Sequence, residues 1–352
     1  MTKLIIQIPA YNEEQTLGTT LRALPRELPG VDVVEWLVID DGSSDRTVEV
    51  AQTHGADHVI RLARHQGLAR AFIAGIEACV SLGADIIVNT DADNQYRADD
   101  IGRLIAPVLR HEAEMVIGAR PIAQIRHFSL TKKLLQKLGS WVVRLASGTN
   151  IPDAPSGFRA YSRNAAMQLR VFNEYTYTLE TIIQAGQKNM AITWVPIRTN
   201  PDTRPSRLVR SVPSYVFRSL MTIGRIFMTY RPLRFFAVPG ITLFLLGVAL
   251  GVRFLAYYFG GVGGGHVQSL ILAALLLGGG FFLGVVGLVV DLISVNRQLL
   301  ERLDYRMHAL ENATQPSGDH SQLPRIFTIP VAPTANVGDL LGGHDSHHNA
   351  HA

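Results

Sequence analysis

Short apolar runs alternate with amphipathic segments over the first 120 residues of the chain. The apolar runs predict strands at 3–10, 33–41, 58–63, 84–90 and 114–120. The segments between them carry apolar residues three or four positions apart, and this spacing predicts helices at 12–24, 43–55, 67–83 and 98–113. Because strands that alternate with helices form parallel sheets covered on both faces, the pattern predicts an α/β fold with a mostly parallel sheet.

Two much longer apolar runs follow at 235–259 and 267–290. Each is long enough to cross the hydrocarbon core of a membrane as a helix, which needs about 20 residues. The connector between them, at 260–266, is short and rich in glycine, so the two runs are expected to form a transmembrane hairpin with both ends on the same side. The alternative is a pair of helices buried in a large soluble core, and such helices seldom run so far without polar interruption.

Arginines flank the hairpin and are absent from its connector. They precede the first apolar run at positions 231 and 234 and follow the second at positions 297, 302 and 306. Cytoplasmic loops of membrane proteins carry an excess of basic residues. The sequence therefore predicts a multi-pass protein of the cell membrane with two spans, in which both chain ends and the domain before the hairpin lie in the cytoplasm.

The segments on either side of the hairpin have amphipathic patterns. Residues 207–234 combine an apolar helical face with many arginines, which predicts an interfacial helix attracted to anionic membrane lipids; a helix packed on the domain is the alternative. Residues 291–311 predict a juxtamembrane helix that either packs on a partner subunit of a homo-oligomer or continues the second span. The tail at 312–352 is rich in Pro, Gly, Ser and His, a composition that predicts disorder.

Composition narrows the class of protein. Hydrophobic residues make up 47% of the 352 residues and charged residues only 18%, a balance that favours a membrane-associated protein. The net charge of +4 is too small for so long a chain to indicate nucleic acid as a partner. Cys79 is the single cysteine, so no disulfide forms within the chain, which suits a domain that faces the cytosol.

Polar and charged residues stand at the ends of four predicted strands. They are Tyr11 and Glu13 after the first strand, Asp40 and Asp41 at the end of the second, Asp91 and Asp93 after the fourth, and Arg120 at the end of the fifth. In parallel α/β sheets, ligands bind outside the carboxyl ends of the strands. The sequence therefore predicts that these side chains converge on one rim and form a binding site there.

Asp91 and Asp93 stand one residue apart in the segment "NTDADNQY". Two ionised carboxylates this close repel each other, and a divalent cation relieves that repulsion. Mg²⁺ and Mn²⁺ prefer oxygen ligands and are often shared between one or two carboxylates and substrate phosphates. An Asp-x-Asp sequence alone usually forms a solvated turn. Here it follows an apolar strand of an α/β pattern, which favours a metal–diphosphate site.

Five ordered motifs carry a resemblance to a known family over roughly residues 1–210, and the domain that contains them is predicted to span residues 1–206. They are "IPAYNEE", "VIDDGSSDRT", "TDADNQY", "VIGAR" and "SGFRAYSR". Together they resemble family-2 glycosyltransferases of GT-A fold, in particular the branch of dolichol-phosphate-mannose synthases and bacterial polyprenyl-phosphate glycosyltransferases. The resemblance implies metal-dependent, inverting transfer of a hexose from a UDP- or GDP-linked sugar to undecaprenyl or dolichyl phosphate.

The resemblance also implies roles for residues on the donor side of the site. It assigns Pro9, Tyr11 and Glu13 to the nucleotide pocket, and Asp40 or Asp41 to contact with the base or ribose. It places the metal and the diphosphate on Asp91 and Asp93, with Ala92 and Gln95 beside them. Arg120 would face the donor or acceptor phosphate, since arginine can make two parallel hydrogen bonds to a phosphate.

On the acceptor side, the resemblance implies that the segment at 150–163 lies near the lipid phosphate. Ser156 and Arg159 would contact the acceptor, and Asp153 would orient it or act as a base. A packed, capped turn is the alternative for this segment. The basic stretch with Arg204, Ser206 and Arg207 would close over the donor phosphates.

Three departures from the family pattern leave the nucleotide and the sugar open. They are His65-Gln66 in place of an asparagine, Tyr96 in place of a histidine, and "RPSRL" in place of a glycine-containing loop. A processive polysaccharide synthase is the alternative enzyme, but the Gln-x-x-Arg-Trp motif of that class is absent. A non-catalytic membrane scaffold is a further alternative, although a scaffold has no need of a metal site.

Overall fold

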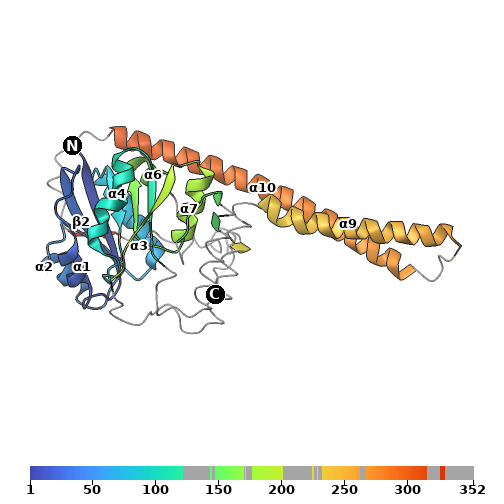
Figure 1. The fold of residues 1–352 in the computed structure, drawn as a ribbon, viewed down its shortest axis with the longest axis horizontal. Helices are drawn as coiled ribbons and strands as arrows, with labels where there is room; N and C mark the ends of the chain where they lie inside the picture. The colour runs from blue at the N-terminus through green and yellow to red at the C-terminus, as the bar shows by residue number, and fades with distance from the viewer. Residues whose placement is uncertain are drawn as a thin grey trace, which may run out of the picture.

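The computed structural model of the chain shows an α/β domain from which a long helical hairpin projects (Figure 1). The structure describes residues 1–121, 143–144, 147–169, 171, 177–200, 224–225, 228, 232–261, 267–314 and 326–329. Most of the predicted interfacial segment at 207–234 and the predicted site residues Arg204, Ser206 and Arg207 lie outside the described residues.

A mixed sheet forms the centre of the domain, in the order β7-β5-β6-β4-β1-β2-β3-β8. The predicted strands are confirmed as β1 (Lys3–Ala10), β2 (Val33–Asp40), β3 (His58–Leu62), β4 (Ile86–Asn89) and β5 (Met115–Ala119). The sheet contains three further strands: β6 (Arg159–Ser162), β7 (Ile192–Pro196) and β8 (Ile326–Ile329). All neighbouring pairs are parallel except those of β6, which runs antiparallel to β4 and to β5. A strand of four residues is too short to reveal its direction in the sequence.

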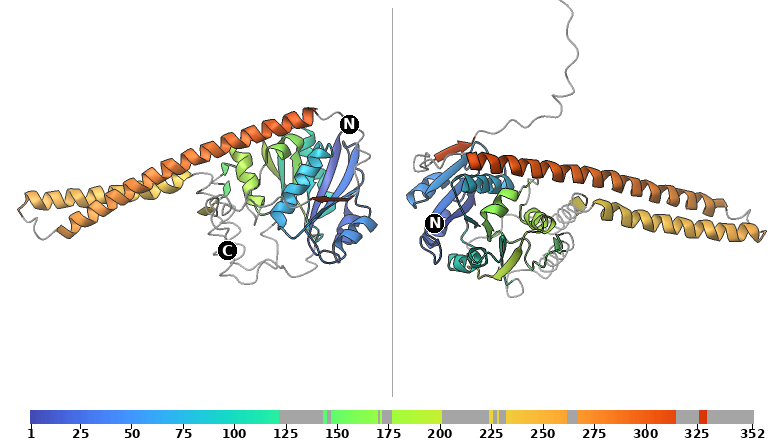
Figure 2. Two further views of the ribbon diagram at one scale, coloured as in Figure 1. Left: turned by 180° about the vertical axis from the view of Figure 1, so that it is seen from behind. Right: turned by 90° about the horizontal axis from the view of Figure 1, so that it is seen from above.

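Helices cover both faces of this sheet, as the sequence predicts (Figure 2). One face packs against α3 (Leu68–Ser81), α6 (Arg163–Gln168) and α7 (Thr178–Gln187), and the other against α1 (Leu17–Ala23), α2 (Thr47–Thr53) and α4 (Ile101–Leu109). The short helix η1 (Ala98–Asp100) leads into α4. Alternate residues of each strand enter opposite cores: Ile5 packs with Phe72 on the α3 face, while Leu4 and Ile6 pack with Leu21 on the α1 face.

The strand register places the predicted rim residues at one edge of the sheet. Ala10 at the end of β1 pairs with Asp40 at the end of β2. On the other side of β1, Gln7 pairs with Asn89, the last residue of β4. Tyr11, Asp41 and Asp91 therefore leave neighbouring strands at the same edge.

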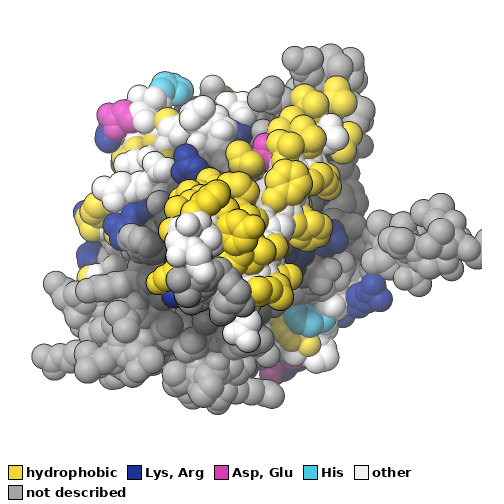
Figure 3. All heavy atoms as spheres, turned by 90° about the vertical axis from the view of Figure 1, so that its right-hand side faces the viewer, with side chains coloured by type: hydrophobic (Ala, Val, Ile, Leu, Met, Phe, Trp, Pro, Cys, Tyr) yellow, Lys and Arg dark blue, Asp and Glu magenta, His cyan; other side chains and the backbone are white. Residues whose placement is uncertain are grey.

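Two helices form the projecting hairpin, α9 (Pro232–Phe259) and α10 (Val267–Thr314). The candidate spans have mean hydropathies of 2.3 and 2.4. In the most apolar 18-residue stretch of each span, only 11% and 17% of the residues are buried. Hydrophobic side chains gather on the surface of the hairpin (Figure 3). A pair of core helices in a soluble protein would be mostly buried, so these exposed apolar surfaces fit candidate membrane spans instead.

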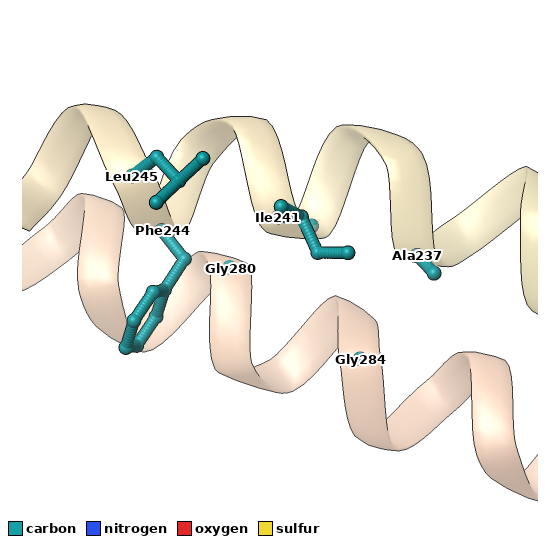
Figure 4. A pocket seen from close by; sticks show the side chains of 7 residues that line it. Ala237, Ile241, Phe244, Leu245, Gly280 and Gly284 are labelled. Atoms are coloured by element: carbon teal, nitrogen blue, oxygen red, sulfur yellow. The ribbon is translucent and has the colours of Figure 1, made fainter.

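Glycines allow α9 and α10 to pack closely. A Cβ atom added at Gly280 would lie 2.6 Å from the carbonyl oxygen of Gly240 and 2.7 Å from the backbone nitrogen of Phe244. Small residues at such contacts let the backbones of membrane helices approach each other. A shallow apolar groove of about 300 Å³ runs beside this contact, between Ile241 on α9 and Gly284 on α10 (Figure 4).

The predicted juxtamembrane helix at 291–311 is a direct continuation of the second span. α10 runs unbroken for 48 residues, which corresponds to about 72 Å at 1.5 Å per residue. Its later part lies over the domain and contacts α6 (Figures 1 and 2). This is the second of the two arrangements that the sequence left open for the segment.

The sequence predicts disorder throughout the tail at 312–352. This prediction is wrong for two short stretches. Residues 312–314 complete α10, and β8 at Ile326–Ile329 pairs in parallel with β3, with Ile60 opposite Phe327. Without β8, β3 would be an edge strand with unpaired backbone groups, and a tetrapeptide of β-branched and aromatic residues can satisfy them. The average composition of a 41-residue tail conceals so short a stretch.

Replacing Gly280 by leucine should destabilise the hairpin, because the new side chain meets backbone atoms that cannot move aside. Overpacking of this kind costs about 1–3 kcal/mol. The measurement is unfolding of the full chain in detergent by added SDS, followed by circular dichroism. Gly278→Leu is the matched control, since nothing lies within 4 Å of a Cβ added there. Equal unfolding midpoints for the two variants would contradict this packing.

Candidate functional site

The rim of the sheet carries two groups of side chains. Asp91, Asp93, Tyr96, Arg120 and Asp153 form one group at the ends of β4 and β5. The other group stands at the ends of β1, β2 and β3 and is built around Tyr11, Asp41 and His65. The prediction that these strand ends share one edge is confirmed by the sheet register.

Asp91 is partly exposed and lies in a strongly perturbed environment. Burial and the neighbouring Asp93 carboxylate raise its pKa from an ordinary value of 3.8 to about 7, while Arg120 and a hydrogen bond from Tyr96 act in the opposite direction. Two carboxylates this close are seldom ionised together unless a positive charge lies between them. A hard divalent cation provides that charge and prefers carboxylate oxygens as ligands. The residues present therefore fit Mg²⁺ or Mn²⁺.

The number of protein ligands at this position is small. Among the described residues, no group of three or more His, Cys, Asp or Glu side chains gathers where it could hold a metal ion. A cation on Asp91 and Asp93 would take its remaining ligands from substrate and water, an arrangement that Mg²⁺ commonly adopts with substrate phosphates.

The loop with the two aspartates is fixed through its backbone. The hydroxyl of Thr20 donates to the carbonyl of Ala92 at 2.8 Å, and the backbone N–H of Gln95 donates to Asp93 at 3.1 Å. On its far side, the backbone N–H of Asn200 donates to the carbonyl of Gln95 at 2.9 Å. Ala92 is buried, so it supports the loop, whereas Gln95 is partly exposed beside the aspartates.

Arg120 makes a two-pronged ion pair with Asp153. Its Nε lies 2.8 Å from Oδ2 and its Nη2 lies 3.0 Å from Oδ1, and its backbone N–H also donates to Oδ2 at 3.1 Å. Burial lowers the pKa of Arg120, but the nearby Tyr96, Asp153 and Asp91 raise it by more. The pKa is therefore above its ordinary value, and the guanidinium stays charged. Both oxygens of Asp153 are occupied in this way. The geometry supports an orienting role for Asp153 and not that of a general base.

Arg159 and Ser156 do not face the site, contrary to the sequence-based interpretation. Arg159 is fully buried and donates to the carbonyls of Ser156 and Ala154, both at 2.7 Å, and to the hydroxyl of Thr181 at 2.6 Å. Ser156 is also fully buried, and its hydroxyl has no hydrogen-bond partner among the described residues. Arg159 holds the loop that precedes β6, a structural role that looks the same as phosphate binding in a sequence.

Asp40 and Asp41 also hold loops in this structure. Asp40 is fully buried and accepts the backbone N–H of Ser43 at 3.2 Å. The two oxygens of Asp41 accept the backbone N–H groups of Gln66 and Gly67, each at 2.8 Å. Nδ1 of His65 lies 2.8 Å from the same carboxylate. The predicted contact of either aspartate with a base or ribose is not supported by this geometry, because these partners already occupy the carboxylates.

Tyr11 offers the flat surface on this side of the rim. It is 39% exposed and stacks on His65, with ring centroids 3.8 Å apart. Pro9 is buried within β1, one residue before its end, and Glu13 accepts the hydroxyl of Thr16 at 2.6 Å. Of the predicted pocket residues, Tyr11 is therefore the one that presents an exposed ring, and aromatic rings of this kind stack on nucleobases.

Sequence reasoning missed Tyr96 as a site residue, although it singled out the position as a departure from the family pattern. Tyr96 is buried, stacks on Phe158 with centroids 5.0 Å apart, and hydrogen-bonds Asp91. Its hydroxyl also accepts the backbone N–H of Gly157 at 3.1 Å. The contact with Gly157 joins residues 61 positions apart, which no local pattern reveals.

Comparison with known proteins gives a consistent result. Residues 5–170 match the family described as glycosyl transferase family 2. The undecaprenyl-phosphate mannosyltransferase of Micrococcus luteus is 31% identical, over 55% of this chain and 82% of that protein. The UDP-N-acetylglucosamine–dolichyl-phosphate N-acetylglucosaminyltransferase of Methanococcus voltae is also 31% identical, over 54% of this chain and 83% of that protein.

A solved structure shares the fold of the domain. It is glucosyl-3-phosphoglycerate synthase from Mycobacterium tuberculosis, in complex with Mn²⁺, uridine diphosphate and phosphoglyceric acid. The TM-score is 0.50 at 21% identity, over 63% of this chain and 78% of that one. The predicted GT-A arrangement, a mostly parallel sheet between helices, is confirmed.

The raised pKa of Asp91 predicts how stability depends on pH without metal. The folded protein keeps a proton on Asp91 up to about pH 7, whereas the unfolded chain releases it near its ordinary pKa of 3.8. The folded state thus binds more protons in this window, and the stabilisation is lost as pH rises through it. Asp91→Asn removes this loss, so its melting temperature in EDTA should increasingly exceed that of the wild type from about pH 5 to about pH 8.

Asp99→Asn is the control for this measurement, because Asp99 is 65% exposed and pairs with Arg97 on the surface. Its difference from the wild type should stay small at every pH. A difference for Asp91→Asn that does not change with pH would contradict the assigned environment of Asp91.

Proposed function

The chain belongs to glycosyl transferase family 2, and we propose that it transfers a hexose from a UDP- or GDP-linked sugar to a polyprenyl phosphate. The reaction is metal-dependent and inverts the anomeric centre, and it takes place at the cytoplasmic face of the membrane. The observation that carries this proposal is the carboxylate pair Asp91 and Asp93 at the end of β4, beside the charged guanidinium of Arg120.

On the donor side, positive charges lie where the diphosphate would leave. Mg²⁺ or Mn²⁺ on Asp91 and Asp93 would neutralise the nucleoside diphosphate as it departs. The solved structure with the same fold contains Mn²⁺ and uridine diphosphate. Arg120 adds a fixed positive charge, because Asp153 holds its guanidinium in place before substrate arrives. Tyr11 supplies the aromatic surface on which the nucleobase stacks.

On the acceptor side, little help from a base is needed. The second pKa of a phosphate monoester is about 6, so the lipid phosphate is largely dianionic at neutral pH. Its oxygen can attack the anomeric carbon directly, in line with the departing diphosphate, and this displacement inverts the centre. The occupied carboxylate of Asp153 agrees with such a reaction.

The lipid acceptor is supported by the relatives and by the hairpin. The names of the relatives from Micrococcus luteus and Methanococcus voltae specify undecaprenyl phosphate and dolichyl phosphate as substrates. The two apolar helices α9 and α10 would hold the domain at the membrane that contains such lipids. The arginines at 231 and 234 and beyond position 296 support a cytoplasmic domain.

A transfer assay tests this function. The purified full chain is incubated with radiolabelled UDP- and GDP-sugars, Mn²⁺ or Mg²⁺, and undecaprenyl or dolichyl phosphate. Label should move into the organic phase with one of the donors, and EDTA should abolish the transfer. If no donor labels either lipid in the presence of metal, the proposed function is wrong.

Asp93→Asn should reduce this transfer at least about tenfold, because it removes one negative ligand from the metal–diphosphate site. Turnover is measured at saturating donor and metal, so that weaker binding alone does not explain the loss. Asp99→Asn, six residues further on and 65% exposed, is the matched control and should keep wild-type turnover. Activity of Asp93→Asn within threefold of the wild type would reject its assigned role.

A further inference from the structure

One hydroxyl group joins the two sides of the candidate site. Tyr96 hydrogen-bonds the carboxylate of Asp91, which belongs to the donor side. The same hydroxyl accepts the backbone N–H of Gly157 at 3.1 Å. Gly157 belongs to the loop at 153–158, which also supplies Asp153, the partner of Arg120. A displacement of this loop would therefore change the hydrogen bonding of the side chain that contacts Asp91.

The peptide groups on both sides of Gly157 are held by buried side chains. While its N–H donates to Tyr96, its carbonyl accepts the side-chain amide of Asn89 at 2.8 Å. Asn89 is fully buried at the end of β4, and its amide oxygen accepts from Gln7 of β1 at 2.9 Å. Its amide nitrogen also donates to the hydroxyl of Tyr177 at 2.9 Å. The loop is thus fastened to the two central strands, two residues before Asp91.

There is no free space between the loop and the carboxylate. A Cβ atom added at Gly157 would lie 3.1 Å from Oδ1 of Asp91 and 2.9 Å from the hydroxyl of Tyr177. Contacts this short are closer than ordinary van der Waals distances. The backbone of the loop therefore packs directly on Asp91, and neither can shift without moving the other or breaking the bond to Tyr96.

We propose that Tyr96 is a positioning residue that couples the metal–diphosphate site at Asp91 to the loop at 153–158, whose Asp153 holds Arg120 in place for the substrate phosphates. Its ring is fixed by stacking on Phe158 of that loop, so the hydroxyl is presented to both partners at once. Binding on one side of the site then orders the other side. This coupling rests on the proposed function, and it is reciprocal: acceptor strengthens donor binding by the same factor as donor strengthens acceptor binding.

The test measures binding and not turnover. Mn²⁺ affinity of the full chain in detergent is followed by electron paramagnetic resonance with saturating UDP or GDP, in the absence and presence of citronellyl phosphate, a short and soluble prenyl phosphate. In the wild type, citronellyl phosphate should tighten Mn²⁺ binding at least about threefold. In Tyr96→Phe, Mn²⁺ should bind about tenfold more weakly, equivalent to about 1.4 kcal/mol, and the acceptor effect should fall below about twofold.

Two further variants separate positioning from a general loss of structure. Tyr161→Phe also removes a buried tyrosine hydroxyl, on β6, and should keep both the Mn²⁺ affinity and the acceptor effect. Gly157→Ala leaves Tyr96 intact but presses on Asp91, so it should weaken Mn²⁺ binding without removing any charge. A cooperative thermal unfolding transition, measured for each variant, shows that the variant is folded.

Mn²⁺ affinity and acceptor effect of Tyr96→Phe within twofold of the wild type would overturn the proposal, as would a wild type on which citronellyl phosphate has no effect. These results leave the proposed function standing if the wild type still transfers sugar to lipid. A wild type that binds no Mn²⁺ with either nucleotide and transfers no sugar contradicts the proposed function itself.

Discussion

The crowding of negative charge at Asp91 is the constraint around which the site is built. Burial and the adjacent Asp93 raise the pKa of Asp91 to about 7, and Tyr96 and Arg120 offset part of that cost. The partners come from separate segments: the loop after β4, the end of β5 and the loop before β6. A site that holds two carboxylates this close is unfavourable alone and becomes favourable when a cation and a diphosphate complete it. Under the proposed function, the fold stores a local cost that a metal ion and the donor diphosphate would relieve.

The sequence predicted the parts of the fold that depend on local pattern. The apolar runs located β1 to β5 closely, because buried parallel strands are continuous in apolar residues. The position of the acidic pair at the end of β4 was predicted by the same reasoning. The direction of β6 and the pairing of β8 with β3 escaped it, since four-residue strands carry no periodic signal and their partners are distant in the chain.

The roles of individual polar residues were harder to predict than their positions. Arg159 and Asp41 stand in motifs that suggest ligand binding, but the fold uses their charges to hold backbone groups of loops. A buried arginine that satisfies carbonyls and an exposed arginine that binds phosphate have the same sequence signature. Only burial and partners distinguish them. Tyr96 shows the reverse case, because an apparent departure from a family pattern proved to lie at the centre of the site.

The most direct test of this account is the position of the metal. Crystals of the full chain grown with Mn²⁺ and the nucleoside diphosphate of its donor would be measured at the manganese absorption edge. The account predicts one anomalous difference peak between the diphosphate and the carboxylates of Asp91 and Asp93, with Arg120 still paired to Asp153. A nucleotide bound at the rim with no manganese peak beside Asp91 and Asp93 would contradict it.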